Sequence, residues 1–327
     1  MTDQQTMHAV HSPADVANYT LEIVEARQAN KHLALHTGVG TLDRFMRPVL
    51  PGEVIVVQAN TGQGKTSFMQ IWARSVVKQL QVRENVTDIV VYLSYETMVE
   101  EMGLYDLAAM TGLDSSEVWH GDITDADYLT LQSAAMRRAA MPLWVIGRSM
   151  KRRRQFDLPL SKVQVALHTL EDERGLKPAI VFVDYIQTVP AEGDQKDRRL
   201  AVIDIADRIK ELAVTCGCPV VAGAQAKVEE FTKEGIKLPG TYGAQESSRV
   251  AQDADKVISL WYPKATDPLG SSVSLGTQSY QVTKDLLIIG IRKQRHAEAG
   301  QVFPVRFDPA RSTMTSWDDV PVEDVVF

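Results

Sequence analysis

The chain has 327 residues, 44% of them hydrophobic, which is enough for one large α/β domain or two small ones. Its 35 basic and 42 acidic residues give a net charge of −7, which argues against a generally basic protein that coats nucleic acid but leaves a local basic channel open. No apolar run approaches the roughly 18 residues that a membrane span needs, and residues 1–5 lack the basic and apolar parts of a signal peptide. Cys216 and Cys218, without further cysteine or histidine nearby, are expected to be reduced thiols, so the sequence predicts a cytoplasmic protein.

A single helix is predicted ahead of the first strand. Residues 1–12 are polar and are expected to be disordered. Ser12 and Pro13 mark a helix start, because proline is favoured at the first helical position, and residues 16–26 carry an apolar stripe. A lone helix of this length is not stable in water, so we expect it to dock on its own domain or on a neighbour.

Beyond Gly38, apolar strands alternate with helical stretches. This alternation predicts a mostly parallel, twisted sheet with helices on both faces. After Pro263 the strands are short and separated by turn residues, which predicts an antiparallel C-terminal extension of the sheet. Strands are predicted at 54–58, 89–93, 143–146, 180–183, 220–222, 257–261, 286–291 and 302–307, and helices at 65–80, 97–110, 126–140, 161–174 and 198–215.

Residues 59–67 read Ala-Asn-Thr-Gly-Gln-Gly-Lys-Thr-Ser between a predicted strand and a predicted helix, which is the setting of a phosphate-binding loop. Gly62 and Gly64 allow a tight turn whose N–H groups point at phosphate oxygens. Lys65 is expected to reach the β- and γ-phosphates and the Thr66 hydroxyl to bind Mg²⁺, with the helix N-terminus adding its positive end. The strict pattern has glycine where Ala59 stands, so a glycine-rich turn that binds nothing is the alternative. The predicted binding residues for ATP are Thr61, Gly62, Gln63, Gly64, Lys65, Thr66 and Ser67.

Three predicted strands lead to polar residues at the same edge of the sheet. Strand 180–183 ends at Asp184, where a phosphate-loop enzyme carries a second group for Mg²⁺; the alternative is an acid that caps the following turn. Strand 89–93 leads to Glu96, which could polarise the attacking water or favour a helix N-terminus. Strand 220–222 leads to Gln225, which could touch the γ-phosphate or be an ordinary strand-end amide.

Several segments carry clustered cations that could contact nucleic acid. Residues 226–249 form a predicted loop whose length is typical of function or disorder, although its glutamates weaken the nucleic-acid interpretation. The run 148–154 holds basic residues that suit phosphates, with a solvated insertion loop as the alternative. The candidates for DNA contact are Lys196, Arg198, Arg199, Lys233, Lys237 and Arg249.

Cations also end the predicted strand 286–291. Lys293 and Arg295 stand far along the chain from the phosphate loop, so they could serve a nucleotide that a neighbouring subunit holds. The catalytic candidates are therefore Lys65, Glu96, Asp184, Gln225, Lys293 and Arg295.

Taken in order, these motifs resemble the C-terminal motor domain of DnaB-type replicative helicases. The resemblance runs from about residue 12 to the C-terminus, and several motifs in the correct order are more specific than any one of them. The initial Ala59 of the phosphate loop is common in that family. The other matching segments are His36-Thr-Gly-Val-Gly-Thr-Leu-Asp43, Leu93-Ser-Tyr-Glu96, Val183-Asp-Tyr-Ile-Gln187, Cys218-Pro-Val-Val-Ala-Gly-Ala-Gln225, residues 245–255 and Arg292-Lys-Gln-Arg295.

The resemblance implies a RecA-like P-loop NTPase that hydrolyses ATP with Mg²⁺. It implies that Glu96 is the catalytic acid, that Asp184 lies on the Walker B strand, that Gln225 is a sensor, and that Lys293 and Arg295 act on the adjacent subunit's nucleotide. It also implies a homo-oligomeric ring, a hexamer, that moves on single-stranded DNA.

The chain departs from this family ahead of the motor domain. Family members carry an N-terminal collar that recruits primase, whereas here only a tail and linker helix, residues 1–34, precede the motor domain at 35–327. This difference favours a specialised motor of a phage, plasmid or mobile element, working with a replication or mobile-element protein. Two other functions would use the same nucleotide site: a nucleotide switch that assembles with protein partners without unwinding DNA, and a recombinase-like filament former.

Overall fold

A computed structural model describes most of the chain as two units, residues 1–35 and residues 36–327. No helix within the described ranges is long and apolar enough to cross a membrane. The two cysteines are free thiols, with Cys218 buried and Cys216 half-buried, and burial raises the pKa of both. The described residues are 10–29, 34–83, 87–152, 156–193, 197–226, 237–241, 243 and 248–318.

The first unit contains the predicted helix, α2 (Pro13–Ala29). Its start is capped reciprocally, because Asp15 N–H donates to Ser12 Oγ and Ser12 N–H donates to the Asp15 carboxylate. Val16, Tyr19 and Ile23 follow one side of the helix at spacings of three and four residues, and each is about half exposed. The predicted stripe is therefore narrower than expected, since Leu21 and Val24 fall outside that side. The prediction of a disordered 1–12 lies mainly outside the described residues.

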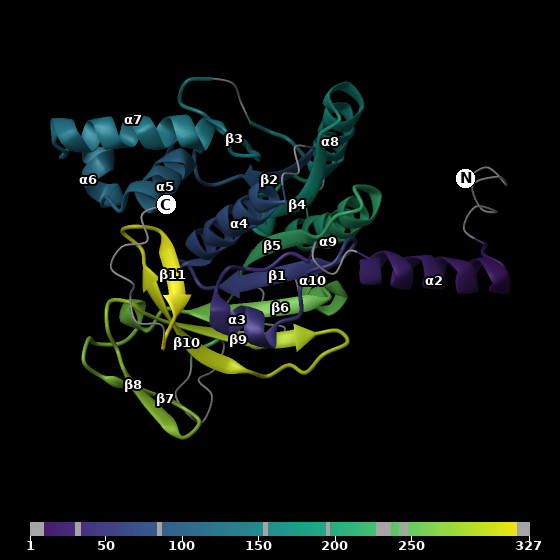
Figure 1. The fold of residues 1–327 in the computed structure, drawn as a ribbon. Helices are drawn as coiled ribbons and strands as arrows, with labels where there is room; N and C mark the ends of the chain where they lie inside the picture. Colours follow the sequence, from purple (N-terminus) through teal and green to yellow (C-terminus); the bar gives the residue numbers. More distant parts are fainter. Residues whose placement is uncertain are drawn as a thin grey trace. The chain divides into compact units, whose positions relative to one another are not determined.

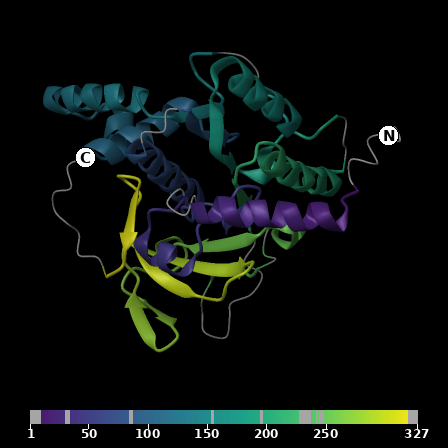
Figure 2. The same cartoon turned by 45° about the vertical axis from the view of Figure 1, so that its right-hand side comes forward.

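The second unit is built on one nine-stranded sheet (Figure 1), in the order β11-β10-β9-β6-β1-β5-β4-β2-β3. The six strands from β6 to β3 run parallel, and β9, β10 and β11 extend the sheet antiparallel, as predicted. A separate hairpin, β7–β8, projects from this end in both views (Figures 1 and 2). The strands are β1 (Val54–Ala59), β2 (Asp88–Ser94), β3 (Leu143–Gly147), β4 (Lys177–Asp184), β5 (Val220–Gln225), β6 (Lys256–Trp261), β7 (Ser272–Leu275), β8 (Gln278–Gln281), β9 (Leu286–Gln294), β10 (Val302–Asp308) and β11 (Thr313–Ser316).

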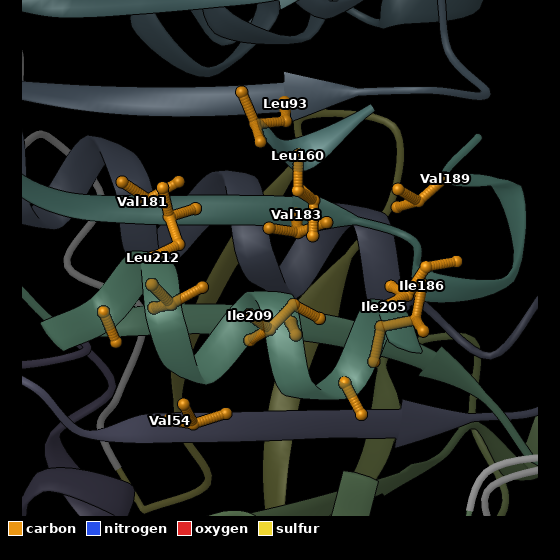
Figure 3. Close-up of a cluster of buried hydrophobic side chains, with 14 of the residues drawn as sticks. Val54, Leu93, Leu160, Val181, Val183, Ile186, Val189, Ile205, Ile209 and Leu212 are labelled. Carbon is orange, nitrogen blue, oxygen red and sulfur yellow. The ribbon is translucent and has the colours of Figure 1, made fainter. Parts of the chain in front are cut away.

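Helices cover both faces of the parallel strands. On one face, Ile205, Ile209 and Leu212 of α9 pack with Val54 and Val181 in one apolar cluster (Figure 3). On the other face, α4 buries Phe68 and Trp72, and Trp72 makes an edge contact with Phe182 of β4. The helices are α3 (Gly40–Phe45), α4 (Lys65–Val82), α5 (Val99–Thr111), α6 (Ser115–His120), α7 (Asp125–Ala139), α8 (Leu160–Arg174), α9 (Arg198–Thr215) and α10 (Ser248–Asp253), with short 3₁₀ turns at Ile186–Thr188 and Pro263–Ala265.

The predicted fold class is confirmed, and every predicted helix and strand is present within a few residues of its expected ends. Among the described residues, the prediction missed the two 3₁₀ turns and the short elements α3, α6, α10, β7, β8 and β11. None exceeds six residues, which is too short for a periodic apolar pattern. The predicted loop 226–249 ends two residues early, because α10 begins at Ser248, and residues 227–236 lie outside the described part.

Candidate nucleotide-binding site

The loop between β1 and α4 has the backbone conformation that phosphate binding needs. Gly62 and Gly64 have φ values of 74° and 79°, in the left-handed region where a side chain is disfavoured. Gly64 directly precedes α4, and a Cβ added there would lie 3.3 Å from Phe307 Cε1. Glycine at position 64 therefore serves both the turn and a close approach to β10.

The carboxyl ends of the parallel strands meet around this loop. Because β1 lies between the parallel strands β5 and β6, the carboxyl ends of all three strands face the same crevice. The crevice is a pocket of about 310 Å³. It is lined by Ala59, Asn60, Thr61, Gly62, Gly64, Lys65, Thr66, Ser67, Glu96, Tyr185, Gln225, Tyr262, Phe307 and Pro309.

Lys65 places its ammonium group between an acid and an aromatic ring. Its Nζ lies 3.9 Å from Asp184 Oδ1 and 3.8 Å from the centroid of the Tyr185 ring. Burial lowers the pKa of Lys65, and the nearby Asp184 and Glu96 carboxylates oppose that shift. The predicted lysine therefore interacts electrostatically with both predicted acids.

Asp184 is buried at the end of β4, and only one of its two carboxylate oxygens accepts a hydrogen bond from a described residue. Its Oδ2 accepts a hydrogen bond of 2.9 Å from the Tyr92 hydroxyl. Its Oδ1 is buried and accepts no hydrogen bond from any described residue. A buried carboxylate oxygen without a donor fits a hard cation such as Mg²⁺, and Thr66, which can offer a hydroxyl oxygen, lines the adjoining pocket.

Glu96 stands on the segment that follows β2 and is exposed at the rim of the pocket. Two contacts fix that segment. Tyr95 N–H donates to the Asp184 carbonyl at 2.9 Å, and Ser94 Oγ donates to the Thr97 carbonyl at 2.6 Å. The carboxylate is therefore held beside the pocket on a tied turn while it remains open to water.

Gln225 reaches from the end of β5 to the phosphate loop. Its Nε2 donates to Thr61 Oγ1 at 2.8 Å. Its backbone is held by Gln187, which accepts from Gln225 N–H at 3.1 Å and donates to the Gln225 carbonyl at 3.1 Å. Gln187 lies in the segment 183–187 that carries the family resemblance, but its pairing with Gln225 was not predicted.

Gln63 differs from the other predicted nucleotide-binding residues. Its side chain is buried, and its Oε1 accepts a hydrogen bond from the Tyr262 backbone N–H. Gln63 does not line the pocket formed by the described residues. Its side chain instead joins the phosphate loop to the end of β6.

An aromatic wall closes the pocket on the side of β6 and β10. Tyr262 and Phe307 meet edge to face, with ring centroids 5.6 Å apart, and Pro309 lies beside them. Tyr185 and Tyr262 each follow a parallel strand, so the strand-end argument could have found them. Phe307 could not be found in this way, because β10 reaches the pocket through antiparallel pairing.

Lys293 and Arg295 lie near the amino ends of the parallel strands, whereas the phosphate loop follows the carboxyl end of β1. In the antiparallel pairing of β9 with β6, Gln294 is opposite Lys256, the first residue of β6. Arg295 Nη1 forms an ion pair of 3.1 Å with Asp255 Oδ1, and its side chain is 50% exposed. Lys293 Nζ donates to the carbonyls of Ala251 and Gln252 at the end of α10. Neither residue lines the pocket formed by the described part of its own chain.

The candidate DNA-binding cations are only partly described. Lys196 and Lys233 lie outside the described residues, as do the side chains of Arg198 and Arg199, whose backbone begins α9. Lys237 forms an ion pair of 2.8 Å with Asp267, and Arg249 contacts Asp207 at 3.3 Å and Asp253 at 3.4 Å. These two cations are therefore paired within the chain.

A second pocket, of about 590 Å³, adjoins the basic run after β3. It is lined by Arg148, Ser149 and Met150 together with Met98, Phe156, Asp157 and Pro190. The Glu100 carboxylate holds this turn, accepting from Ser149 Oγ and from Lys151 N–H. Arg153 and Arg154, which end the run, lie outside the described residues.

Comparison with known proteins places the chain in a family. The family model described as "DnaB-like helicase C terminal domain" matches residues 34–315. The replicative DNA helicase DnaC of Bacillus subtilis (strain 168) is 24% identical over 309 residues, which are 92% of this chain and 61% of that protein. The replicative DNA helicase DnaB of Geobacillus stearothermophilus is 25% identical over 276 residues, 81% of this chain and 53% of that protein. The chain thus spans roughly half to three fifths of these relatives.

Two solved structures share the fold. The ATPase domain of G40P superposes with a TM-score of 0.74 at 17% identity, covering 94% of this chain and 99% of that chain. A DnaB-like replicative helicase, described with its primase interactions, superposes with a TM-score of 0.73 at 17% identity and covers 94% of this chain and 67% of that chain. Because the family match covers most of the sequence, this protein belongs to the family of DnaB-like helicase C-terminal domains.

Proposed function

We propose that the protein is a Mg²⁺-dependent ATPase that works as a ring-shaped motor on single-stranded DNA. The observation that carries this proposal is the pocket that unites the phosphate loop, Glu96 and Gln225, with the buried Asp184 carboxylate 3.9 Å from Lys65 Nζ. Family membership supports the same reaction. The free, buried thiol of Cys218 is in keeping with a cytoplasmic setting.

Each pocket residue has a role that its position supports. Lys65 neutralises the β- and γ-phosphates, and the loop N–H groups and the start of α4 hold their oxygens. Thr66 and Asp184 would hold Mg²⁺, which would supply positive charge against the phosphates when bound. Glu96 orients and polarises the attacking water from the exposed rim. Gln225, which donates to Thr61 Oγ1 through Nε2, would contact the γ-phosphate.

The aromatic wall gives the pocket a place for the base. Tyr262 and Phe307 present apolar surface on the side of the pocket away from β2 and β4. Aromatic faces stack on any base, so this wall supports nucleotide binding without selecting adenine. The proposal of ATP therefore rests on the family and not on the wall.

Assembly into a ring, a hexamer by family resemblance, is supported by an uncovered apolar face on α7. Leu131 and Ala134 of α7 are buried, whereas Tyr128, Leu129 and Met136 on its other side are 56%, 65% and 71% exposed. Leu129 and Met136 are seven residues apart, so they form an exposed stripe along one side of the helix, and Tyr128 is adjacent to Leu129 in the chain. The helix α7 lies at the outer edge of the unit in both views (Figures 1 and 2). We propose that α2 of a neighbouring copy, with its apolar side at Val16, Tyr19 and Ile23, covers this stripe.

Charging the α7 stripe should therefore break the assembly. We expect Met136→Glu to shift the protein toward monomers, because the new carboxylate would be buried against an apolar helix. The measurement is mass by light scattering after gel filtration across a range of protein concentrations. Val165→Glu on α8 is the matched control, since Val165 is similarly exposed, at 65% against 71% for Met136. An assembly that survives Met136→Glu at every concentration would place the subunit contact elsewhere.

Single-stranded DNA should stimulate ATP turnover, and salt should weaken the stimulation. An acidic chain can bind DNA only where its cations converge, and a ring repeats each cation around one pore. We expect Arg198→Glu with Arg199→Glu to weaken DNA binding while basal turnover remains. The control reverses the charges of Lys177 and Arg208, two surface cations whose ion pairs contribute little to stability.

The nucleotide-switch function is the second candidate. The pocket beside the basic run favours it, because Arg148 and Met150 there could receive a replication or mobile-element protein. If DNA neither binds nor stimulates turnover at about 50 mM salt, where phosphate contacts are strong, the motor proposal fails and the switch replaces it. A recombinase-like filament would instead give open helical assemblies in particle images.

A further inference from the structure

The segment 237–241 is seated across the sheet by side chains of three adjacent strands. Gln58 of β1 donates through Nε2 to the Gly240 carbonyl, and Ser259 of β6 donates through Oγ to the Pro239 carbonyl at 2.9 Å. Arg292 of β9 donates through Nε to the same Pro239 carbonyl at 3.1 Å. The segment is thus bound to the sheet mainly through its own carbonyl groups.

Gln58 and Ser259 form a polar pair inside an apolar sheet. They are opposite each other in the parallel register of β1 with β6, and Gln58 Nε2 donates to Ser259 Oγ at 2.9 Å. Both residues are fully buried, and Gln58 Oε1 has no hydrogen-bond partner among the described residues. Burying an amide with an unsatisfied oxygen is costly, so the two bonds from its nitrogen are the interactions that offset the cost.

The sheet is also shaped to receive the segment. Gly290 of β9 lies opposite Ser259, and a Cβ there would lie 3.3 Å from Leu238 Cδ1 and 3.3 Å from Arg292 Nε. Leu238 is 4% exposed and packs in an apolar cluster with Trp261 and Leu286. A side chain at position 290 would crowd both Leu238 and Arg292, so the glycine makes room for the segment.

The chain ahead of the segment is anchored at the same place. Ala226 N–H donates to the Ala59 carbonyl at 2.9 Å, and Ala226 follows Gln225, which contacts the phosphate loop. Gly240 is bonded to Gln58, the residue before Ala59. Ala226 is therefore hydrogen-bonded to Ala59, and Gly240 to Gln58, the preceding residue of β1. Both contacts lie directly ahead of the phosphate loop.

We propose that Gln58 and Ser259 are positioning residues that tie the segment 237–241 to the end of β1, so that nucleotide binding is transmitted to this segment and the response of turnover to DNA depends on the pair. Neither residue lines the nucleotide pocket described above. The DNA part of this inference rests on the proposed function; the transmission from nucleotide to segment does not.

The first experiment is independent of DNA. Hydrogen–deuterium exchange at the amides of Leu238, Gly240 and Thr241 is measured on the full chain with and without a non-hydrolysable ATP analogue. We expect the analogue to slow exchange in the wild type by about three- to tenfold, the range of one hydrogen bond, and to have no such effect in Gln58→Met or Ser259→Ala. Gln70→Met is the matched control, because Gln70 is a buried glutamine on α4 whose amide has no partner among the described residues.

The second experiment measures turnover against the concentration of oligo-dT. We expect both variants to need about three- to tenfold more DNA for half-maximal stimulation while basal kcat stays within about twofold, a split that general destabilisation would not give. Unfolding curves verify that each variant is folded. If Gln58→Met does not fold, Ser259→Ala, which removes only a hydroxyl group, decides the question.

The outcomes separate the two proposals. Wild-type stimulation by DNA with unchanged responses in both variants would overturn the inference and leave the motor intact. A wild type that DNA does not stimulate refutes the motor, and the exchange experiment then decides the inference alone. Exchange that does not respond to the analogue in the wild type overturns the inference in either case.

Discussion

Replacing Arg295 with alanine should lower ATP turnover by about 10³- to 10⁵-fold while each subunit still binds nucleotide. The reason is geometric. Arg295 is held by Asp255 at the amino end of β6, and the phosphate loop leaves the carboxyl end of β1 at the other edge of the sheet. Because this half-exposed guanidinium does not line the pocket of its own chain, we propose that it serves a nucleotide held by another subunit. Arg208→Ala, which removes an exposed arginine of α9, is the control and should retain turnover.

Mixing subunits tests the assignment directly. Lys65→Ala subunits lose the cation for the γ-phosphate but keep Arg295, and Arg295→Ala subunits have the reverse defect. Each variant alone should be nearly inactive. Mixed assemblies should regain activity wherever an intact Arg295 faces an intact phosphate loop. Co-assembly is verified by mass, and mixed rings without any recovery would rule out action between subunits.

Glu96→Gln should lower hydrolysis by about 10²- to 10⁴-fold and leave ATP affinity close to that of the wild type, since only the activation of water is lost. Glu96 suits this role because it is exposed at the rim of the pocket, on a turn tied to Asp184 through the Tyr95 N–H. Binding of a fluorescent ATP analogue and single-turnover hydrolysis are the two measurements.

Glu101→Gln provides the matched control for Glu96. Glu101 is a half-buried glutamate of α5 that accepts a hydrogen bond from the Tyr105 hydroxyl and is absent from the pocket lining. Its substitution should leave both measurements unchanged. If Glu96→Gln abolishes binding as well as hydrolysis, Glu96 holds the turn in place and another group activates the water.

The parallel core of the fold was predictable because its sequence pattern is strong. Continuous apolar runs such as 54–57 and 180–183 specify strands buried on both faces, and the phosphate loop fixes which end of β1 carries the site. The strand-end argument led to Glu96 and Gln225, which line the pocket, and to Asp184, which is buried beside Lys65. These predictions depend only on order along the chain and on parallel pairing.

Contacts that depend on antiparallel pairing or on side-chain direction were not predictable. Phe307 lies 242 positions beyond Lys65 in the chain, and only the pairing of β10 with β9 brings it to the phosphate loop. Gln63 stands inside the loop motif, yet its side chain points away to the Tyr262 N–H. The pairing of Lys237 with Asp267 depends on how the segment 237–241 crosses the sheet, which no local pattern encodes.

Strand β1 connects two of the predicted catalytic residues of one chain, Arg295 near its amino end and Lys65 beyond its carboxyl end. At its amino end, Val54 N–H donates to Asp255 Oδ2 at 2.9 Å, and Asp255 holds Arg295. At its carboxyl end the chain enters the loop that carries Lys65. Six residues of strand span roughly 20 Å, and a strand paired on both sides resists stretching. In the ring that we propose, β1 would link each nucleotide pocket to the arginine that serves the next pocket. We therefore expect force generated at one nucleotide to reach the neighbouring nucleotide through β1.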